Sequence, residues 1–325
     1  MHSSISSSDC ESLPKPRWRA DLTRSACFLL LLFVLDRGIG IFLHAGIERY
    51  FGLDRPADIV CVGYSRTLLG IDPDLPAKRT GLRVAVYAVN GATQADRHAM
   101  VQQFLSEHPE TKLLIYDVEA PSFSSENLSS NSYTLFFPFI ENPFMNSYLR
   151  RSCDSWDEYW LRRVCWSCRY NEVTLWLAIR GWLGLHKNLK YGDFDPARFR
   201  WQVNQGKTQP VDVEPEEYRL FMQTIKFATR RGVHVLLVNM PTVDLLNARD
   251  KSGQEAVFRI FRCLAKNNPL VLYADYHRAF QHRYGFFYDA IHLNGTGQRA
   301  LTGLIASYIV QARLWPPREQ RLASH

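Results

Sequence analysis

The stretch ADIVCVGYS, residues 57–65, decides the fold of this chain. The run from Asp58 to Val62 predicts a buried strand that ends in a glycine-containing turn. Four more strands are predicted at 82–89, 111–121, 233–241 and 270–275. Helical spacing of apolar residues is found at 96–108, 218–232, 257–267 and 295–313. Alternating strands and helices predict an α/β domain over residues 55–320, with a three-layer, flavodoxin-like parallel sheet covered on both faces.

The overall composition is that of a globular protein. Hydrophobic residues make up 46% of the 325 residues and charged residues 22%, which excludes global disorder. The net charge of +7 comes from Lys and Arg residues that are scattered along the chain. Because they form no compact basic stripe with interleaved aromatic residues, we do not expect a nucleic acid partner.

The N-terminal 45 residues predict a membrane anchor. A polar, basic tail at residues 1–22 precedes an apolar segment at residues 23–45. Basic residues in that position predict a cytoplasmic tail and a translocated main domain. Asp36 and Arg37 interrupt the apolar segment, and we expect them near the outer interface, because a charge at the bilayer centre costs about 2.5–3.5 kcal/mol. A cleaved signal peptide and a buried helix of a cytosolic protein are the alternatives.

Residues 121–213 break the α/β pattern and predict an aromatic-rich insertion. Six of the eight tryptophans of the chain lie in this segment. Aromatic surfaces can stack on sugars or lie at membrane interfaces. Aromatic rings also fill cores, and we expect these rings to fill a small core of the insertion itself.

The seven cysteines do not predict a metal site. Cys153, Cys165 and Cys168 cluster in the insertion, but a single C-x-x-C pair supplies only two of the four ligands of a closed zinc site. If this region lies outside the cytoplasm, one disulfide within the cluster is expected, and free thiols are the equal alternative.

Three residues far apart in the sequence are candidates for nucleophilic catalysis. Ser65 follows the first predicted strand, and Asp289 and His292 lie after the fifth, so all three belong to the carboxyl edge of the sheet, where ligands bind in open α/β folds. A serine hydroxyl needs a base to take its proton, and that base needs an orienting carboxylate. A simple Gly-x-Ser turn and a helix cap by the aspartate are the ordinary explanations of the same residues.

Three segments resemble blocks I, II and V of the SGNH/GDSL hydrolase superfamily: DIVCVGYSRT (58–67), NGAT (90–93) and DAIHLNGTGQRALT (289–302). The resemblance covers residues 57–120 and 215–312 and leaves out the insertion. With its membrane segment, the chain more narrowly resembles the membrane-anchored SGNH-like proteins of polysaccharide O-acetylation. Those include the alginate O-acetylation proteins and the D-alanyl transfer protein of teichoic acids. The resemblance implies the SGNH hydrolase fold.

The resemblance also implies a role for each candidate residue. Ser65 would be the nucleophile, His292 the base and Asp289 its orienter, and the backbone N–H groups of Ser65 and Gly91 would form the oxyanion hole. The sequence departs from the family in two places. Tyr64 stands where block I has an aspartate, and the block III asparagine is absent. No cofactor and no metal are implied.

Arg66, Asn90 and Asn294 are the candidates for substrate binding. Arg66 could hold a carboxylate or phosphate of the acceptor, or it could pair with a neighbour such as Asp117 or Glu119. The two asparagines stand in the motif segments after the second strand and before the last helix.

These features predict a membrane-anchored, extracytoplasmic serine acyl-esterase or O-acyltransferase, with acetyl as the expected acyl group. Its substrate would be a cell-surface polysaccharide or exopolysaccharide, or another acylated glycan, and a membrane-bound O-acyltransferase is a possible partner. The expected location is the inner (cytoplasmic) membrane, with one span and a periplasmic or extracellular catalytic domain. The alternatives are a lipase-like carboxylesterase and a catalytically inactive SGNH fold that binds glycan or scaffolds an acylation complex.

Overall fold

The predicted three-layer α/β fold is confirmed. The computed structural model describes residues 18–124, 132–205, 211–247, 251–312 and 314. Five parallel strands form one sheet in the order β2-β1-β3-β4-β5, the flavodoxin-like order. Their bounds are β1 (Ile59–Gly63), β2 (Val84–Ala88), β3 (Leu113–Val118), β4 (His234–Asn239) and β5 (Val271–Asp275). All five strands fall at segments that the sequence predicts.

Helices cover both faces of this sheet because its strands are apolar on both sides. Val60 and Leu114 belong to one hydrophobic cluster, whereas their neighbours Cys61 and Ile115 belong to the other. The first face is covered by α4 (Gln94–Glu107), α9 (Pro215–Thr229) and α11 (Lys251–Asn267), and the second by α3 (Asp74–Thr80) and α12 (Gly295–Gln311). Short helices α2 (Ser65–Gly70) and α10 (Asp244–Asn247) follow β1 and β4.

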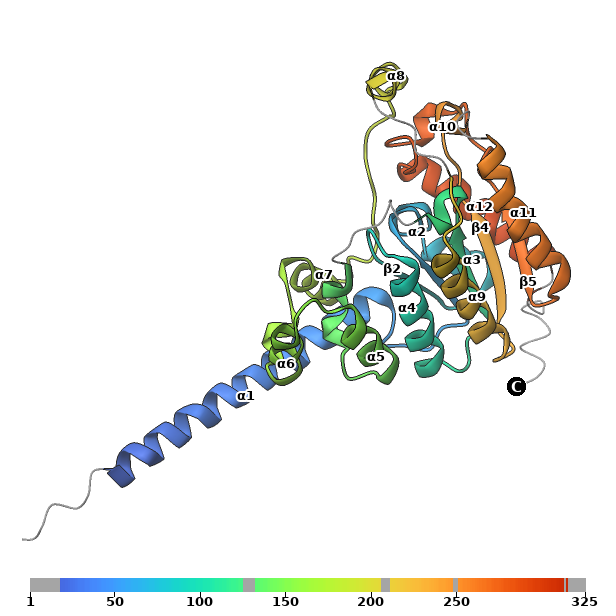
Figure 1. Cartoon of the computed structure of the whole chain (residues 1–325). Helices are drawn as coiled ribbons and strands as arrows, with labels where there is room; N and C mark the ends of the chain where they lie inside the picture. The colour runs from blue at the N-terminus through green and yellow to red at the C-terminus, as the bar shows by residue number, and fades with distance from the viewer. Residues whose placement is uncertain (1–17, 125–131, 206–210, 248–250, 313, 315–325) are drawn as a thin grey trace, which may run out of the picture.

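Helix α1 (Trp18–Phe51) has two parts with different surroundings. Its segment Asp21–Phe51 is long and apolar enough to cross a membrane. Figure 1 shows the N-terminal half of α1 projecting away from the α/β body. The C-terminal part joins the core, where Ile47 is completely buried. The end of the membrane segment predicted at residue 45 therefore falls inside a continuous helix, and the last turns of that helix are buried in the α/β body.

The insertion is helical, and its buried residues join both hydrophobic clusters of the sheet. It contains the 3-10 helices η1 (Ala120–Phe123), η3 (Ser132–Phe139) and η4 (Ser167–Arg169), and the α-helices α5 (Pro143–Ser152), α6 (Trp156–Val164), α7 (Glu172–Trp182) and α8 (Pro196–Gln205). Phe136 and Phe137 are buried in the same cluster as the sheet residues. Trp156, Trp160 and Trp176 are more than half exposed. The expectation that the rings fill a core of the insertion is therefore wrong for these three tryptophans.

Candidate active site

A tight strand-to-helix turn presents Ser65 at the carboxyl edge of the sheet. β1 ends at Gly63, and Ser65 is the first residue of α2. A Cβ atom on Gly63 would overlap the side chain of Thr67, so glycine is required for this close turn. Tyr64, between Gly63 and Ser65, is buried, whereas the side chain of Ser65 is partly exposed.

The loop before α12 brings His292 to this serine. The imidazole Nε2 of His292 lies 2.8 Å from Ser65 Oγ, and its Nδ1 lies 2.7 Å from Asp289 Oδ2. With the Nδ1 proton donated to the carboxylate, Nε2 is left to accept the proton of the hydroxyl. The three side chains thus form one continuous chain of hydrogen bonds, and the expected convergence is observed.

Asp289 also orders its own turn. Its Oδ1 accepts the backbone N–H groups of Ile291 at 3.0 Å and of His292 at 2.9 Å. Burial raises the pKa of Asp289, but the hydrogen bonds from His292 and Ile291 outweigh it and hold the pKa below its usual range. The carboxylate is therefore charged at neutral pH and stabilises one imidazole orientation. The helix-cap explanation of Asp289 is wrong, because the turn that its Oδ1 orders is not helical and α12 is capped by Asn294.

The loop after β2 carries Asn90 and Gly91. It is held by hydrogen bonds from the Val89 N–H to Gly63 O and from the Ala92 N–H to Val89 O. Gly91 has a φ of 72°, a left-handed conformation that favours glycine. Within the described ranges, no acceptor takes the backbone N–H of Gly91 or of Ser65. Asn90 is exposed.

Arg66 does not have the free guanidinium that substrate binding would need. The residue is 2% exposed, its Nη1 lies 2.6 Å from Glu119 Oε2, and its Nη2 donates to Met240 O. Of the two expectations for Arg66, the structure supports the ion pair with a neighbour. The ion pair between the buried guanidinium of Arg66 and the carboxylate of Glu119 stabilises the loop after β3.

Asn294 is a helix cap. Its Oδ1 accepts the backbone N–H groups of Thr296 and Gly297 at the start of α12, and its Nδ2 donates to Gly285 O at 2.8 Å. The side chain is 7% exposed. The substrate-binding role expected for Asn294 is corrected to a structural one, because all of its hydrogen-bonding atoms are used inside the fold.

No motif in the sequence indicates that the insertion reaches the candidate active site. The segment after α7 runs along the loop of His292, where the Phe194 N–H donates to Phe287 O at 2.8 Å and the Gly295 N–H donates to Lys190 O. The Lys190 ammonium lies 5.4 Å from the centre of the Tyr288 ring. These residues lie about a hundred positions before their partners and carry no motif, so only the folded chain brings them together.

Within the described part of the chain, no group of three or more His, Cys, Asp or Glu side chains is arranged to hold a metal ion. The arrangement can instead supply a hydroxyl nucleophile, a base and two backbone N–H groups, which are the components of acyl transfer.

Comparison with known proteins finds similar folds. The sequence matches no protein-family model and no curated protein. A GDSL-like lipase from Bacteroides thetaiotaomicron has a TM-score of 0.42 at 11% identity, over 83% of this chain and 99% of that one. The catalytic domain of a peptidoglycan O-acetyltransferase from Streptococcus pneumoniae has a TM-score of 0.37 at 11% identity, over 81% and 97%. A family 2 carbohydrate esterase with a carbohydrate-binding domain from Corynascus thermopiles has a TM-score of 0.40 at 12% identity, over 80% and 68%.

Proposed function

We propose that this protein is a serine acyl-esterase or O-acyltransferase of the SGNH type, anchored by α1 with its catalytic domain outside the cytoplasm. The observation that carries the proposal is the hydrogen-bonded chain from Ser65 through His292 to Asp289. A hydroxyl that faces an imidazole, which in turn faces a charged carboxylate, is the arrangement that makes a serine nucleophilic.

The proposed reaction has two steps. Ser65 Oγ attacks the carbonyl carbon of an ester while its proton passes to His292 Nε2, and the N–H groups of Ser65 and Gly91 stabilise the oxyanion. The ester C–O bond then breaks, and His292 returns the proton to the departing alkoxide. Water or a sugar hydroxyl next gives its proton to His292 Nε2 and attacks the acyl carbon of the acyl-serine. The bond from the acyl carbon to Ser65 Oγ then breaks, and His292 returns the proton to Oγ, which leaves the acyl group on the water or sugar oxygen and restores Ser65.

We propose acetyl as the acyl group, and a cell-surface polysaccharide or exopolysaccharide as the acceptor or substrate. Both proposals rest on the motif resemblance together with the apolar helix α1. The catalytically inactive alternative is kept because no asparagine stands directly after β3, where Glu119 is paired with Arg66.

Labelling of the full-length protein in detergent tests this proposal. A fluorophosphonate probe should label Ser65, and p-nitrophenyl acetate should be hydrolysed. Ser65→Ala should abolish both, whereas Ser307→Ala, a control at an exposed serine of α12, should retain both. Labelling or hydrolysis that survives in Ser65→Ala would favour the binding or scaffolding function. Faster hydrolysis of long-chain esters than of acetyl esters would favour a lipase-like enzyme.

A further inference from the structure

The insertion carries a large apolar surface that the fold leaves uncovered. Exposed apolar side chains lie on α6, on α7 and at the residue that caps α7. They are Trp156, Trp160, Leu161, Val164, Val173, Leu175, Trp176, Ile179, Trp182 and Leu183. We call this set the α6–α7 apolar surface. Such a surface is unusual for a protein surrounded by water.

The α6–α7 apolar surface is continuous with α1. Trp182 stacks on Phe42 of α1 with 4.9 Å between ring centres, and its Nε1 donates to Phe42 O. Farther along, α1 and α7 cross so closely that a Cβ atom on Gly181 would overlap the Gly46 carbonyl oxygen. Figure 1 shows α6 and α7 beside α1 where it joins the body. Helix α7 of the insertion is therefore fixed to α1.

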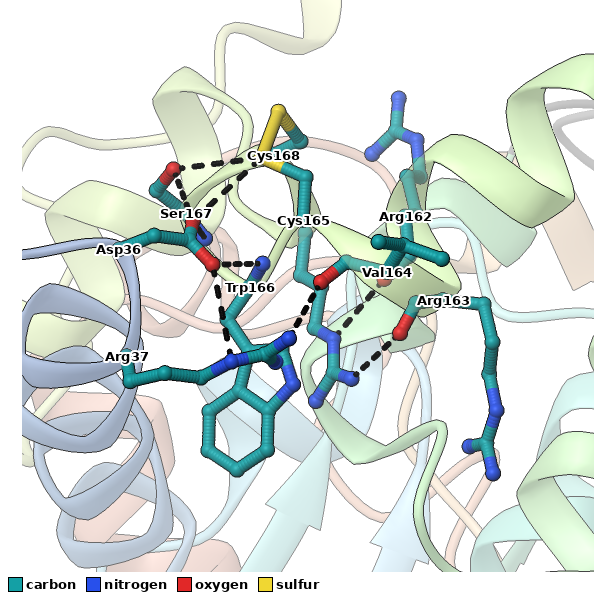
Figure 2. Close-up of a disulfide and its surroundings, with 10 residues drawn as sticks. Asp36, Arg37, Arg162, Arg163, Val164, Cys165, Trp166, Ser167 and Cys168 are labelled. Atoms are coloured by element: carbon teal, nitrogen blue, oxygen red, sulfur yellow. Dashed lines mark hydrogen bonds and ion pairs between the residues drawn. A yellow bond between two sulfur atoms is a disulfide. The ribbon is translucent and has the colours of Figure 1, made fainter. Parts of the chain in front are cut away.

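A polar clamp fixes the depth of the insertion along α1. Asp36 accepts the backbone N–H groups of Trp166 at 3.0 Å and Ser167 at 2.8 Å, and the Ser167 hydroxyl at 2.7 Å. Arg37 donates to Val164 O at 2.9 Å and lies over the Trp166 ring. Figure 2 shows these bonds beside the Cys165–Cys168 disulfide, so of the two alternatives left open for the cysteine cluster, this structure has the disulfide.

The length of α1 places this clamp at the membrane. The exposed apolar residues of α1 run from Leu22 to Phe42, which is about 30 Å of helix and matches the hydrocarbon core of a bilayer. Ending the span at Leu35 would leave only about 20 Å. Asp36 and Arg37 therefore lie about 8–9 Å inside the apolar limit at Phe42. The residues of the insertion that bind them must lie at the same depth.

We propose that the α6–α7 apolar surface is embedded in the lipid of the extracytoplasmic leaflet, next to α1. The inference rests on the membrane anchoring proposed above. Trp160, Leu161 and Val164 would enter the headgroup and upper acyl-chain region, as amphipathic helices do at an interface. The exposed cations Arg150 and Arg151, which line a hollow with Trp156, would meet lipid phosphates. Asp36 is tolerated at this depth because the insertion supplies its hydrogen bonds.

Fluorescent probes in nanodiscs test this arrangement in the full-length chain. Cysteines are introduced as Leu161→Cys (α6), Leu183→Cys (after α7), Leu31→Cys (α1) and Val310→Cys (α12), positions that are all at least half exposed. Each is labelled with NBD in a background with Cys10, Cys27, Cys153 and Cys263 changed to alanine. Lipids with a doxyl quencher at carbon 5 or carbon 12 report the depth. Equal far-ultraviolet circular dichroism checks that each variant is folded.

We expect 5-doxyl lipid to quench the probes at residues 161 and 183 more strongly than 12-doxyl lipid, and neither to quench the probe at residue 310. The probe at residue 31 should be quenched strongly by 12-doxyl lipid. Unquenched probes at 161 and 183 together with a quenched probe at 31 would overturn the inference, leave the anchor standing and assign the surface to a protein partner. An unquenched probe at 31 would overturn the proposed anchoring itself. Equal quenching at 310 would also overturn the inference.

Discussion

Two carboxylates of this protein are held in almost the same way and have different consequences. Asp289 and Asp36 each accept two backbone N–H groups and one side-chain donor. The side-chain donor of Asp289 is an imidazole, whose second nitrogen reaches Ser65. The side-chain donor of Asp36 is the Ser167 hydroxyl, which carries no such link to a nucleophile. A candidate catalytic carboxylate therefore differs from a structural one in the group that its side-chain donor contacts next: here the donor of Asp289 contacts the hydroxyl of Ser65.

The two sites also differ in where their donors come from. Asp289 takes its hydrogen bonds from residues two and three positions later, whereas Asp36 takes them from residues about 130 positions later. The turn at Asp289 is made by neighbouring residues, whereas the long-range clamp at Asp36 forms only if α1 and the insertion pack correctly. Substitutions at the site of Asp289 should therefore change the rate of the reaction, and substitutions at the site of Asp36 should change the free energy of unfolding.

Breaking the link from Asp289 to Ser65 should have the largest effect. His292→Ala should lower kcat/KM for p-nitrophenyl acetate by roughly 10⁵–10⁶-fold, and Asp289→Asn by roughly 10⁴-fold, since the aspartate orients and does not take the proton. The double variant Ser65→Ala/His292→Ala should be little worse than either single variant. Additive losses would contradict a unit of three residues. Asp36→Asn, the matched carboxylate, should leave kcat/KM close to the wild-type value.

Separating α1 from α7 should have the next largest effect, on folding stability. Gly181→Ala places a methyl group against the Gly46 carbonyl oxygen, and backbone cannot move aside as a side chain can. We expect a loss of about 3 kcal/mol or more in the free energy of unfolding, measured by denaturant titration in detergent. Gly38→Ala on α1 has nothing within 4 Å of its new Cβ atom and should change stability by about 1 kcal/mol at most. Equal effects would contradict a fixed crossing.

Removing the clamp carboxylate should cost less. Asp36→Ala leaves two backbone N–H groups and a hydroxyl without their acceptor, and we expect about 1–3 kcal/mol of destabilisation in the same titration. Asp21→Ala is the control on the same helix, since the side chain of Asp21 is 67% exposed and pairs with Arg24. Asp21→Ala should change the free energy of unfolding by about 1 kcal/mol at most. If both variants behave alike, Asp36 does not hold the insertion.

Substitution of Asp117, a buried carboxyl near the candidate site, should have the smallest effect, which is a change in how folding stability depends on pH. Burial in the sheet raises the pKa of Asp117 from 3.8 to about 7, although Arg66 opposes the shift. The folded state therefore binds this proton more tightly than the unfolded chain. Its contribution to stability is fully present below about pH 4 and is lost as the pH rises through about 7.

Asp117→Asn removes this titration, so its melting temperature should fall less than that of the wild type between pH 5 and pH 8. The expected difference is a few degrees in thermal unfolding. Asp54→Asn, at an ion pair on the surface with Arg49, should keep the wild-type pH dependence. A variant at residue 117 with an unchanged pH dependence would show that another group is responsible.

The sequence alone was enough to place most of the fold and the proposed nucleophile, base and orienter. Apolar runs and helical spacing predict elements because they depend only on neighbouring residues. The parallel sheet then brings Ser65 and His292 to one edge, since all strands end there. The cap by Asn294 was also readable, as an asparagine directly before a helix, but its place in a motif favoured a binding role.

Tertiary structure decided the rest. Whether Arg66 meets a substrate or Glu119 depended on which side chains surround the turn after β1, and no local pattern encodes that burial. The exposure of Trp160 and Trp176 and the pairing of Asp36 with Ser167 depended on how the insertion packs against α1. The strength of a hydrogen bond or an apolar contact depends on partners brought together by folding, so residues about 130 positions apart left no periodic sign of their contact in the sequence.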